Sequence, residues 1–176
     1  AIILGEGTSP RLYVNLVEKM DENIFNLIDA ESYSFRDGSN FFVQANLNSQ
    51  YKERAIELVK NEIEKLKEGV TERELNKAKK KLKSRFACEV ETVSEIGESI
   101  GYYMTVCDDL DLAEKYIPIC ESITSEDLAQ VAKEFLDINN KIYFSMEDGY
   151  FYYNNRLVEG LTKVELKAKG ITQTLT

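Results

Sequence analysis

Histidine is absent from this 176-residue chain. Without an imidazole, the chain cannot carry a His-containing catalytic triad, a histidine general base or the common His-ligated zinc site. Positive charge is in the minority as well, with 22 Lys and Arg against 31 Asp and Glu and a formal net charge of −9. Because phosphate contacts need clustered positive charge, no nucleic-acid partner is expected.

Long apolar runs and low-complexity stretches are also missing. The mean hydropathy is −0.35, and no segment is apolar enough over sufficient length to cross a bilayer, so no membrane partner is expected. Two prolines and nine glycines are too few for a low-complexity chain. Hydrophobic residues make up 43% of the 20.2 kDa chain, which is enough for a real core in a single domain over residues 1–176.

Cysteine is scarce and irregularly placed. The three cysteines, Cys88, Cys107 and Cys120, form no C-x-x-C pair, and their number is odd. A zinc ribbon is therefore not expected, and no cofactor is expected in this chain. Free thiols are typical of a reducing compartment, and the first residues lack the basic region of a signal peptide, so a cytoplasmic location is expected.

The first five residues, Ala1-Ile2-Ile3-Leu4-Gly5, have the pattern of a final helical turn with a C-terminal glycine. A domain seldom begins at the end of a helix. We therefore expect the chain to be a fragment of a longer protein.

Two strands joined by a tight turn are expected early in the chain. Apolar alternation favours strands over 24–35 and 40–47, and the Asp-Gly pair in Arg36-Asp37-Gly38-Ser39 favours an antiparallel hairpin between them. A short helix should precede the hairpin, from residue 9 or 10 to residue 19, with Ser9 as its N-cap.

Helical patterns dominate the rest of the chain. A helix is expected over 49–68, where apolar residues recur with helical period, and capping boxes that begin at Thr71 and Thr124 start two more. The remaining expected elements are helices over 93–104 and 109–119 and strands over 141–146 and 150–154. This order predicts an α+β fold, with an antiparallel sheet covered on one face by helices.

Several residue clusters could carry chemistry, but a structural interpretation is favoured for each. Gly5-Glu6-Gly7 lacks the third glycine of a dinucleotide-binding loop, because Pro10 stands in its place. Asp108, Asp109 and Asp111 lack the glycine and final Glu of an EF-hand loop, so they are interpreted as acids at a helix N-terminus.

Three larger groups are interpreted in the same way. They are a basic run (Lys77, Lys79, Lys80, Lys81, Lys83 and Arg85), a group of glutamates (Glu89, Glu91, Glu95 and Glu98) and an aromatic run (Tyr150, Phe151, Tyr152 and Tyr153). The basic run is expected to be a solvated helix face rather than a polyanion patch. The glutamates are not expected to form an acid/base pair, and the aromatic run is expected to pack in a sheet rather than stack on bases.

Three motifs, in order along residues 2–138, resemble one family. Residues 4–19, LGEGTSPRLYVNLVEK, resemble the "LGGG-x-S-SRLF-x-x-LREK" segment of the pitrilysin/insulinase family of zinc peptidases, which includes the mitochondrial processing peptidase. Residues 70–79, VTERELNKAK, resemble its "VT-x-x-EL-x-x-AK" helix start. Residues 123–136, ITSEDLAQVAKEFL, resemble its "VT-x-EDL-x-x-VA-x-x-YL" helix.

The resemblance implies the LuxS/processing-peptidase-like metallohydrolase fold. In that family two similar α+β halves close around a peptide, and zinc sits on an inverted H-x-x-E-H motif in the first half. A chain without histidine is similar to the second, non-metal domain, here missing its first strand and most of its first helix. Zinc is then expected only in the missing N-terminal domain or in a partner subunit. That domain or subunit would pair with this chain and enclose a peptide substrate between them.

The resemblance also implies substrate-facing positions. Active members often carry an Arg in the first motif and a Tyr seven residues later, which face the zinc across the chamber. Here the Arg position is Val17, and the Tyr position is Ile24, or Phe25 if one residue is inserted. None of the three side chains can donate a hydrogen bond. No catalytic residue is therefore assigned, and no hydrolysis by this chain alone is expected.

Three hypotheses follow. In the first, the chain is the C-terminal domain of such a peptidase or of its inactive homologue and walls the peptide chamber. In the second, it is a non-catalytic structural or assembly subunit with the same fold. In the third, it is an unrelated helical adaptor that shares only the capping boxes and would have no strand layer.

Overall fold

The computed structural model describes residues 1–6, 9–89, 91–137, 144–147, 150–153 and 156–157. The chain divides into two compact units, Ala1–Leu136 and Asp137–Thr176. The single domain expected over residues 1–176 stays a prediction.

The first unit contains the predicted hairpin. Strands β1 (Phe25–Phe35) and β2 (Gly38–Leu47) pair antiparallel, from Phe25 opposite Leu47 to Phe35 opposite Gly38. The connecting turn is Arg36-Asp37, so β2 begins two residues earlier than expected. The register shifts once, between Phe25 and Leu27, as in a β-bulge.

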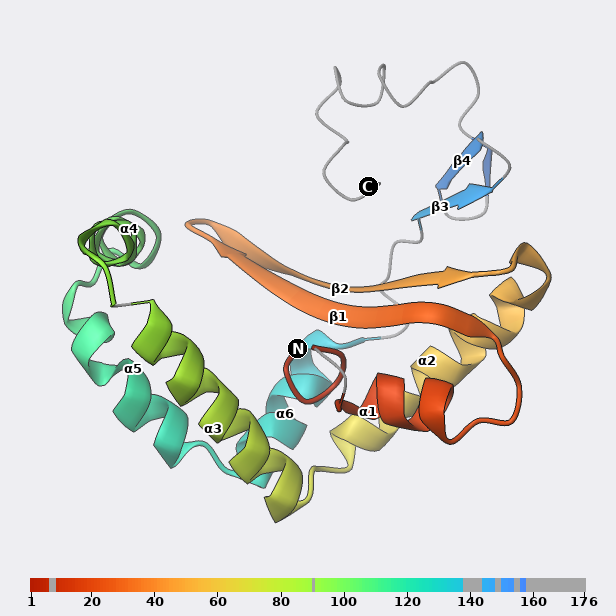
Figure 1. The fold of residues 1–176 in the computed structure, drawn as a ribbon, viewed down its shortest axis with the longest axis horizontal. Coiled ribbons are helices and arrows are strands. Elements are labelled where there is room, and N and C mark those ends of the chain that lie inside the picture. Colours follow the sequence, from red (N-terminus) through yellow and green to blue (C-terminus); the bar gives the residue numbers. More distant parts are fainter. Residues whose placement is uncertain (7–8, 90, 138–143, 148–149, 154–155, 158–176) are drawn as a thin grey trace. The chain divides into compact units, whose positions relative to one another are not determined.

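The hairpin has a buried face and an open face. Ile28 and Ala30 of β1 are buried, and Phe41 and Val43 of β2 pack against the same core. Because side chains alternate along a strand, Leu27 and its same-face neighbours lie on the other side. Figure 1 shows helices α1, α2, α3, α5 and α6 all on one side of the hairpin.

The N-terminal segment packs into this core. Residues Ala1–Gly5 form a turn in which the Gly5 N–H donates to the Ala1 carbonyl at 2.9 Å. Helix α1 (Arg11–Tyr13) then begins one residue later than expected, because Pro10 is extended and occupies the N-cap in place of Ser9. The helix continues as a π-helical segment, η1 (Val14–Glu18).

Helix α2 (Lys52–Lys67) follows the hairpin after a 3₁₀ turn, η2 (Ser49–Tyr51), as expected for residues 49–68. It ends before Gly69, whose φ of +121° is a conformation that glycine adopts without strain. The buried core of the first unit lies between α2, the N-terminal segment and the hairpin. It comprises Leu4, Leu12, Leu16, Ile24, Phe25, Ile28, Ala30 and Ala55.

Four further helices complete the first unit. They are α3 (Glu72–Cys88), α4 (Val93–Tyr102) with its π-helical continuation η3 (Tyr103–Cys107), α5 (Asp111–Ser122) and α6 (Ser125–Phe135). The capping boxes predicted at Thr71 and Thr124 are both present. Helix α5 continues through Pro118 for one more turn, although an end near this residue was expected, because a proline removes a single backbone donor without ending every helix.

The second unit contains a small antiparallel sheet. Strands β3 (Phe144–Glu147), β4 (Tyr150–Tyr153) and β5 (Arg156–Leu157) form an antiparallel sheet in that order. Strand β4 confirms the strand expected at 150–154, whereas the beginning of the one expected at 141–146 lies outside the described residues. Antiparallel strands together with helices on one face of the hairpin confirm the α+β fold class.

Candidate functional site

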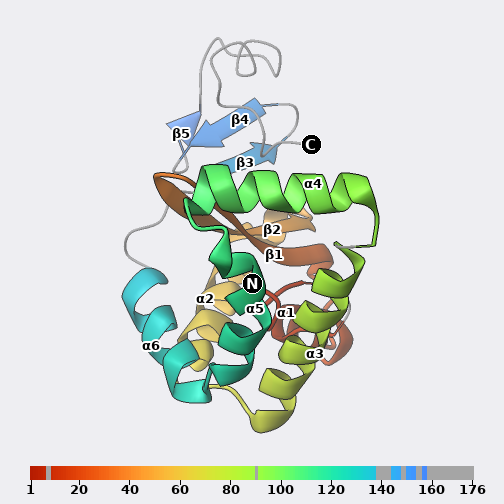
Figure 2. The ribbon, with the colours of Figure 1, turned by 90° about the vertical axis from the view of Figure 1, so that its left-hand side faces the viewer.

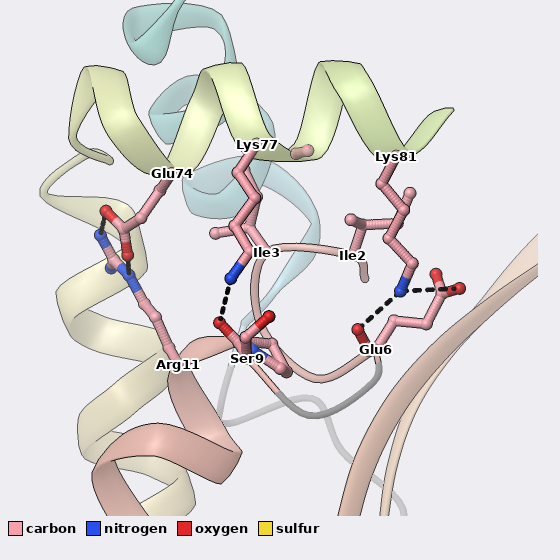
Figure 3. A pocket seen from close by; sticks show the side chains of 10 residues that line it. Ile2, Ile3, Glu6, Ser9, Arg11, Glu74, Lys77 and Lys81 are labelled. Carbon is pink, nitrogen blue, oxygen red and sulfur yellow. Dashed lines mark hydrogen bonds and ion pairs between the residues drawn. The ribbon is translucent and has the colours of Figure 1, made fainter. Parts of the chain in front are cut away.

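The beginning of α3 is bound by an arginine from a distant part of the chain. The Arg11 guanidinium donates to both carboxylate oxygens of Glu74, at 2.6 and 3.0 Å (Figure 3). It also donates to the Gly69 carbonyl at 3.0 Å. Both side chains are largely shielded from water, with 15% of Arg11 and 30% of Glu74 exposed. A two-pronged contact of this kind is the strong form of an ion pair.

Glu74 serves the helix start at the same time. Its carboxylate accepts from the Thr71 N–H at 2.8 Å, while the Thr71 hydroxyl accepts from the Glu74 N–H at 3.3 Å. The hydrogen bond from Arg11, with those from Thr71, lowers the pKa of Glu74 from 4.5 to about 2. The same contact with Glu74 raises the pKa of Arg11, so both groups stay charged at neutral pH.

The third motif contacts the segment that connects α2 to α3. The Ser125 hydroxyl, at the start of α6, accepts from the Val70 N–H at 3.0 Å and donates to the Val70 carbonyl at 2.8 Å. Arg11 belongs to the first motif, Val70 and Glu74 to the second and Ser125 to the third. The three motifs that are far apart in sequence therefore meet between α2 and α3, in what we call the motif junction (Arg11, Gly69–Thr71, Glu74 and Ser125).

A small pocket of about 280 Å³ lies beside the motif junction, between the N-terminal segment and α3. Lys77 and Lys81 project from α3 across it (Figure 3). Lys77 donates to the Ser9 carbonyl at 3.3 Å, and Lys81 donates to the Glu6 carbonyl at 2.8 Å. Because these cations are bound to the chain itself, the pocket serves to anchor the N-terminal segment rather than to present free cations.

The basic run of α3 is thus more than the solvated face that was expected. Arg85 pairs with the Glu6 carboxylate on the pocket side. On another side of the helix, Lys79 donates to the Glu121 carbonyl at 2.7 Å, and Lys83 pairs with the Glu121 carboxylate. These partners could not be predicted from local spacing, because they come from the N-terminal segment and from α5.

A buried carboxylate was missed in the sequence. Glu62 of α2 is 2% exposed, and its carboxylate accepts from the Asn15 amide at 2.9 Å and from Lys65 at 2.6 Å. Three positions after Val59 and four before Leu66, it falls on the apolar face of its helix. A charged residue on such a face could have been recognised as one that needs a buried partner.

The three substrate-facing positions lie in or against the core. Ile24 and Phe25 are 2% and 5% exposed and belong to the buried core, while Val17, within η1, is half-buried against it. In the first unit these side chains contact other apolar side chains. Their role toward a substrate stays a prediction.

Two of the remaining acidic candidates, Glu95 and Asp109, form hydrogen bonds at the starts of helices. Glu95 forms a capping box with Thr92 at the beginning of α4, a role that the sequence interpretation did not assign. The Asp109 carboxylate accepts from the Asp111 N–H at 2.9 Å, and Asp108 has a left-handed backbone at the end of η3. Gly5 packs against β1, and Gly7 lies outside the described residues.

The residues that the structure describes offer no site for a metal ion. No three Cys, Asp or Glu side chains among them are grouped as ligands, so a zinc site does not fit this part of the chain. None of the described helices has the length and apolar composition that crossing a bilayer requires.

Comparisons with known proteins agree with the resemblance of the three motifs. Residues 1–82 match the family described as "Peptidase M16 inactive domain". An uncharacterized zinc protease of Rickettsia felis is 27% identical over 146 residues, which are 83% of this chain and 33% of that protein. The chain thus spans about a third of the length of this relative.

Solved structures share the fold. A protease from Helicobacter pylori is 27% identical, with a TM-score of 0.63 over 77% of this chain and 32% of its own. A peptidase M16 inactive domain from Pseudomonas fluorescens also has a TM-score of 0.63, over 77% of this chain and 32% of its own. Because the two chains are only 21% identical, this likeness shows a shared fold and nothing more. The resemblance stated from the motifs is confirmed, and the unrelated helical adaptor is set aside.

Proposed function

We propose that this chain, which over residues 1–82 is similar to the family described as "Peptidase M16 inactive domain", forms one wall of a peptide-binding chamber as the non-metal domain of a pitrilysin-like peptidase. The catalytic metal would then lie outside the chain. A homologous zinc-bearing domain, in the same protein or in a second subunit as a dimer, is the proposed partner. A cytoplasmic location, argued from the unpaired cysteines, belongs to the same proposal.

The observation that carries this proposal is the open face of the hairpin. Leu27, Tyr33 and Phe35 occupy alternate positions of β1, on the face opposite the core, and are 57%, 51% and 59% exposed. Tyr33 stacks on Phe42 of β2 with 5.5 Å between ring centres. Exposed aromatic side chains on a rigid strand pair are suited to contacting an extended peptide without sequence specificity.

Peptide binding tests the chamber wall directly. Unstructured fluorescent peptides are titrated against the chain and followed by anisotropy. Saturable binding is expected, and the variant Tyr33→Ser/Phe35→Ser should weaken it by about tenfold because it removes two aromatic contacts. Tyr51→Ser, at an exposed tyrosine outside the hairpin, is the matched control and should bind like the parent chain. If the double variant binds the peptides as tightly as the parent chain does, the open face is not the peptide site.

A second candidate function is a structural or assembly subunit with the same fold. Ile24 and Phe25 favour it, because both candidates for the Tyr position are buried in the core and neither can donate a hydrogen bond. This function predicts no saturable peptide binding by the folded chain. The titration therefore separates the two functions.

A further inference from the structure

Helix α4 exposes an apolar stripe. Val93, Ile96 and Ile100 of α4, with Met104 of η3, recur at spacings of three or four and so lie along one face of the helix. Their exposed fractions are 88%, 40%, 47% and 52%. The helix contains no buried residue, which distinguishes it from α2, α3, α5 and α6.

This helix has little support within the first unit. Its substantial contacts are with its own continuation η3, and Figure 2 shows it along the near side of the unit. A helix of ten residues is marginal in water unless its apolar face is buried. A stable α4 therefore needs a cover over the stripe.

Two glycines beside the stripe indicate the shape of that cover. Gly97 and Gly101 lie four residues apart inside α4, and a Cβ added at either would meet no atom within 4 Å. Glycine in a helix interior is destabilising relative to alanine, and no contact in the first unit requires it here. Small residues at this spacing allow a second helix to approach the backbone closely.

The charge at the two ends of the stripe indicates the chemistry of the partner. Between Arg85 and Lys115 the sequence holds no basic residue and eight acidic ones. Glu95 and Glu98 lie on the opposite face of α4 from the stripe. The other six precede or follow the stripe, and they are Glu89, Glu91, Asp108, Asp109, Asp111 and Glu114. A second copy that used the same face would bring these acids together, which is unfavourable. A partner rimmed by Lys and Arg would be attracted instead.

From these features we propose that α4 is the docking site for an amphipathic helix of a partner protein, apolar on one side and flanked by Lys and Arg. The partner's apolar side packs over Ile96, Ile100 and the two glycines, and its basic residues lie near the acids before and after the stripe, such as Glu91 and Asp108. The proposal is independent of the peptide-binding face of the hairpin, which lies on other residues.

A model helix tests the proposal. The probe is a labelled 18-residue peptide with leucines on one side of a helix and lysines elsewhere, titrated against the complete chain. Saturable binding that weakens as salt is added is expected. The same peptide with glutamate in place of lysine should bind at least about tenfold more weakly. Equal binding of both peptides would overturn the charge argument and the proposal with it.

The glycine pair gives the sharpest variant. Gly97→Ala/Gly101→Ala should leave the thermal midpoint unchanged or higher, since alanine favours a helix and the added methyl groups meet nothing in the chain. The same variant should bind the lysine peptide about tenfold more weakly than the parent chain, because the added methyl groups keep the peptide backbone away from α4. Unchanged affinity in this variant would refute close helix docking.

Two further variants exclude binding by net charge alone. Ile100→Asp should abolish saturation, whereas Val131→Asp, at an exposed valine of α6, should not. Equal loss in both variants would mean that the acidic chain attracts the peptide without a site. Sedimentation tests for self-association. If the parent chain forms concentration-dependent dimers and Ile100→Asp does not, the face binds a second copy of this chain and the proposed partner is wrong.

Discussion

At the scale of single residues, the pair Arg11 and Glu74 concentrates several interactions in one place. The two residues are 63 positions apart, yet the arginine contacts the acid of the α3 capping box and the carbonyl of Gly69. Removing either side chain leaves a partly buried charge without its partner. Such losses cost more than the loss of a pair on the surface.

Arg11→Gln should therefore lower the free energy of unfolding by about 2 kcal/mol, and Arg11→Lys by about 1 kcal/mol, because lysine keeps the charge but not the two-pronged geometry. Urea denaturation measures both values. Arg54→Ala removes one half of an exposed ion pair with Glu57 and is the matched control, with an expected change below about 0.5 kcal/mol. If Arg11→Gln is as mild as Arg54→Ala, the motif junction does not stabilise the fold.

Glu74 also predicts how stability depends on pH. Its pKa is about 2 in the folded chain against 4.5 for an unperturbed glutamic acid, so the unfolded chain binds its proton first as pH falls. The stabilisation from this carboxylate is complete above about pH 5 and is lost as the pH falls from about 4.5 toward 2. Its size is about 2 kcal/mol, because partial exposure to water reduces the full effect of the shift.

Comparing the unfolding free energy of the parent chain and Glu74→Gln between pH 7 and pH 3 checks this. The variant should be less stable at pH 7, and the difference should shrink on acidification. Some acid sensitivity remains in the variant, because hydrogen bonds from Thr124 lower the pKa of Asp127 as well. A difference that stays constant over this range would contradict the assigned shift.

At the scale of secondary-structure elements, the N-terminal turn and strand β1 pack more closely than any side chain would allow. A Cβ on Gly5 would lie 2.2 Å from the Ala30 nitrogen and 2.3 Å from the Ala30 Cβ. Ala30 is itself fully buried in the middle of β1. Glycine at position 5 is thus required by a contact between two elements, besides any role in ending a helical turn.

Gly5→Ala should consequently destabilise the chain by about 3 kcal/mol, since backbone has to move to relieve the overlap. Thermal unfolding followed by circular dichroism measures the effect. Gly38→Ala is the matched control, because a Cβ there meets nothing within 4 Å. Equal midpoints for the two variants would show that the N-terminal turn does not pack on β1 in solution.

At the scale of the whole molecule, the described buried core belongs to the first unit. Its eight residues lie between Leu4 and Ala55, all within the unit Ala1–Leu136. A unit with its own core is expected to fold without the segment that follows it.

A chain that ends at Leu136 should therefore unfold in one cooperative transition, with a thermal midpoint within about 4 °C of the main transition of the complete chain. Differential scanning calorimetry makes the comparison. A truncated chain without a cooperative transition would show that residues after 136 are needed to complete the core.

The sequence alone determined the local elements and indicated the family that the chain resembles. Capping boxes at Thr71 and Thr124, the hairpin and the apolar face of α2 are visible in it because each depends on residues only a few positions apart. The absence of histidine likewise settled that no His-ligated zinc lies in this chain.

Only the tertiary structure decided which residues meet. The ion pair of Arg11, the carbonyls bound by the α3 lysines, the burial of Glu62 and the open stripe of α4 all depend on elements that approach from distant parts of the chain. Spacing along the sequence does not predict such contacts. Each depends on how whole elements pack and on the energetic cost of leaving a charge or an apolar face without a partner.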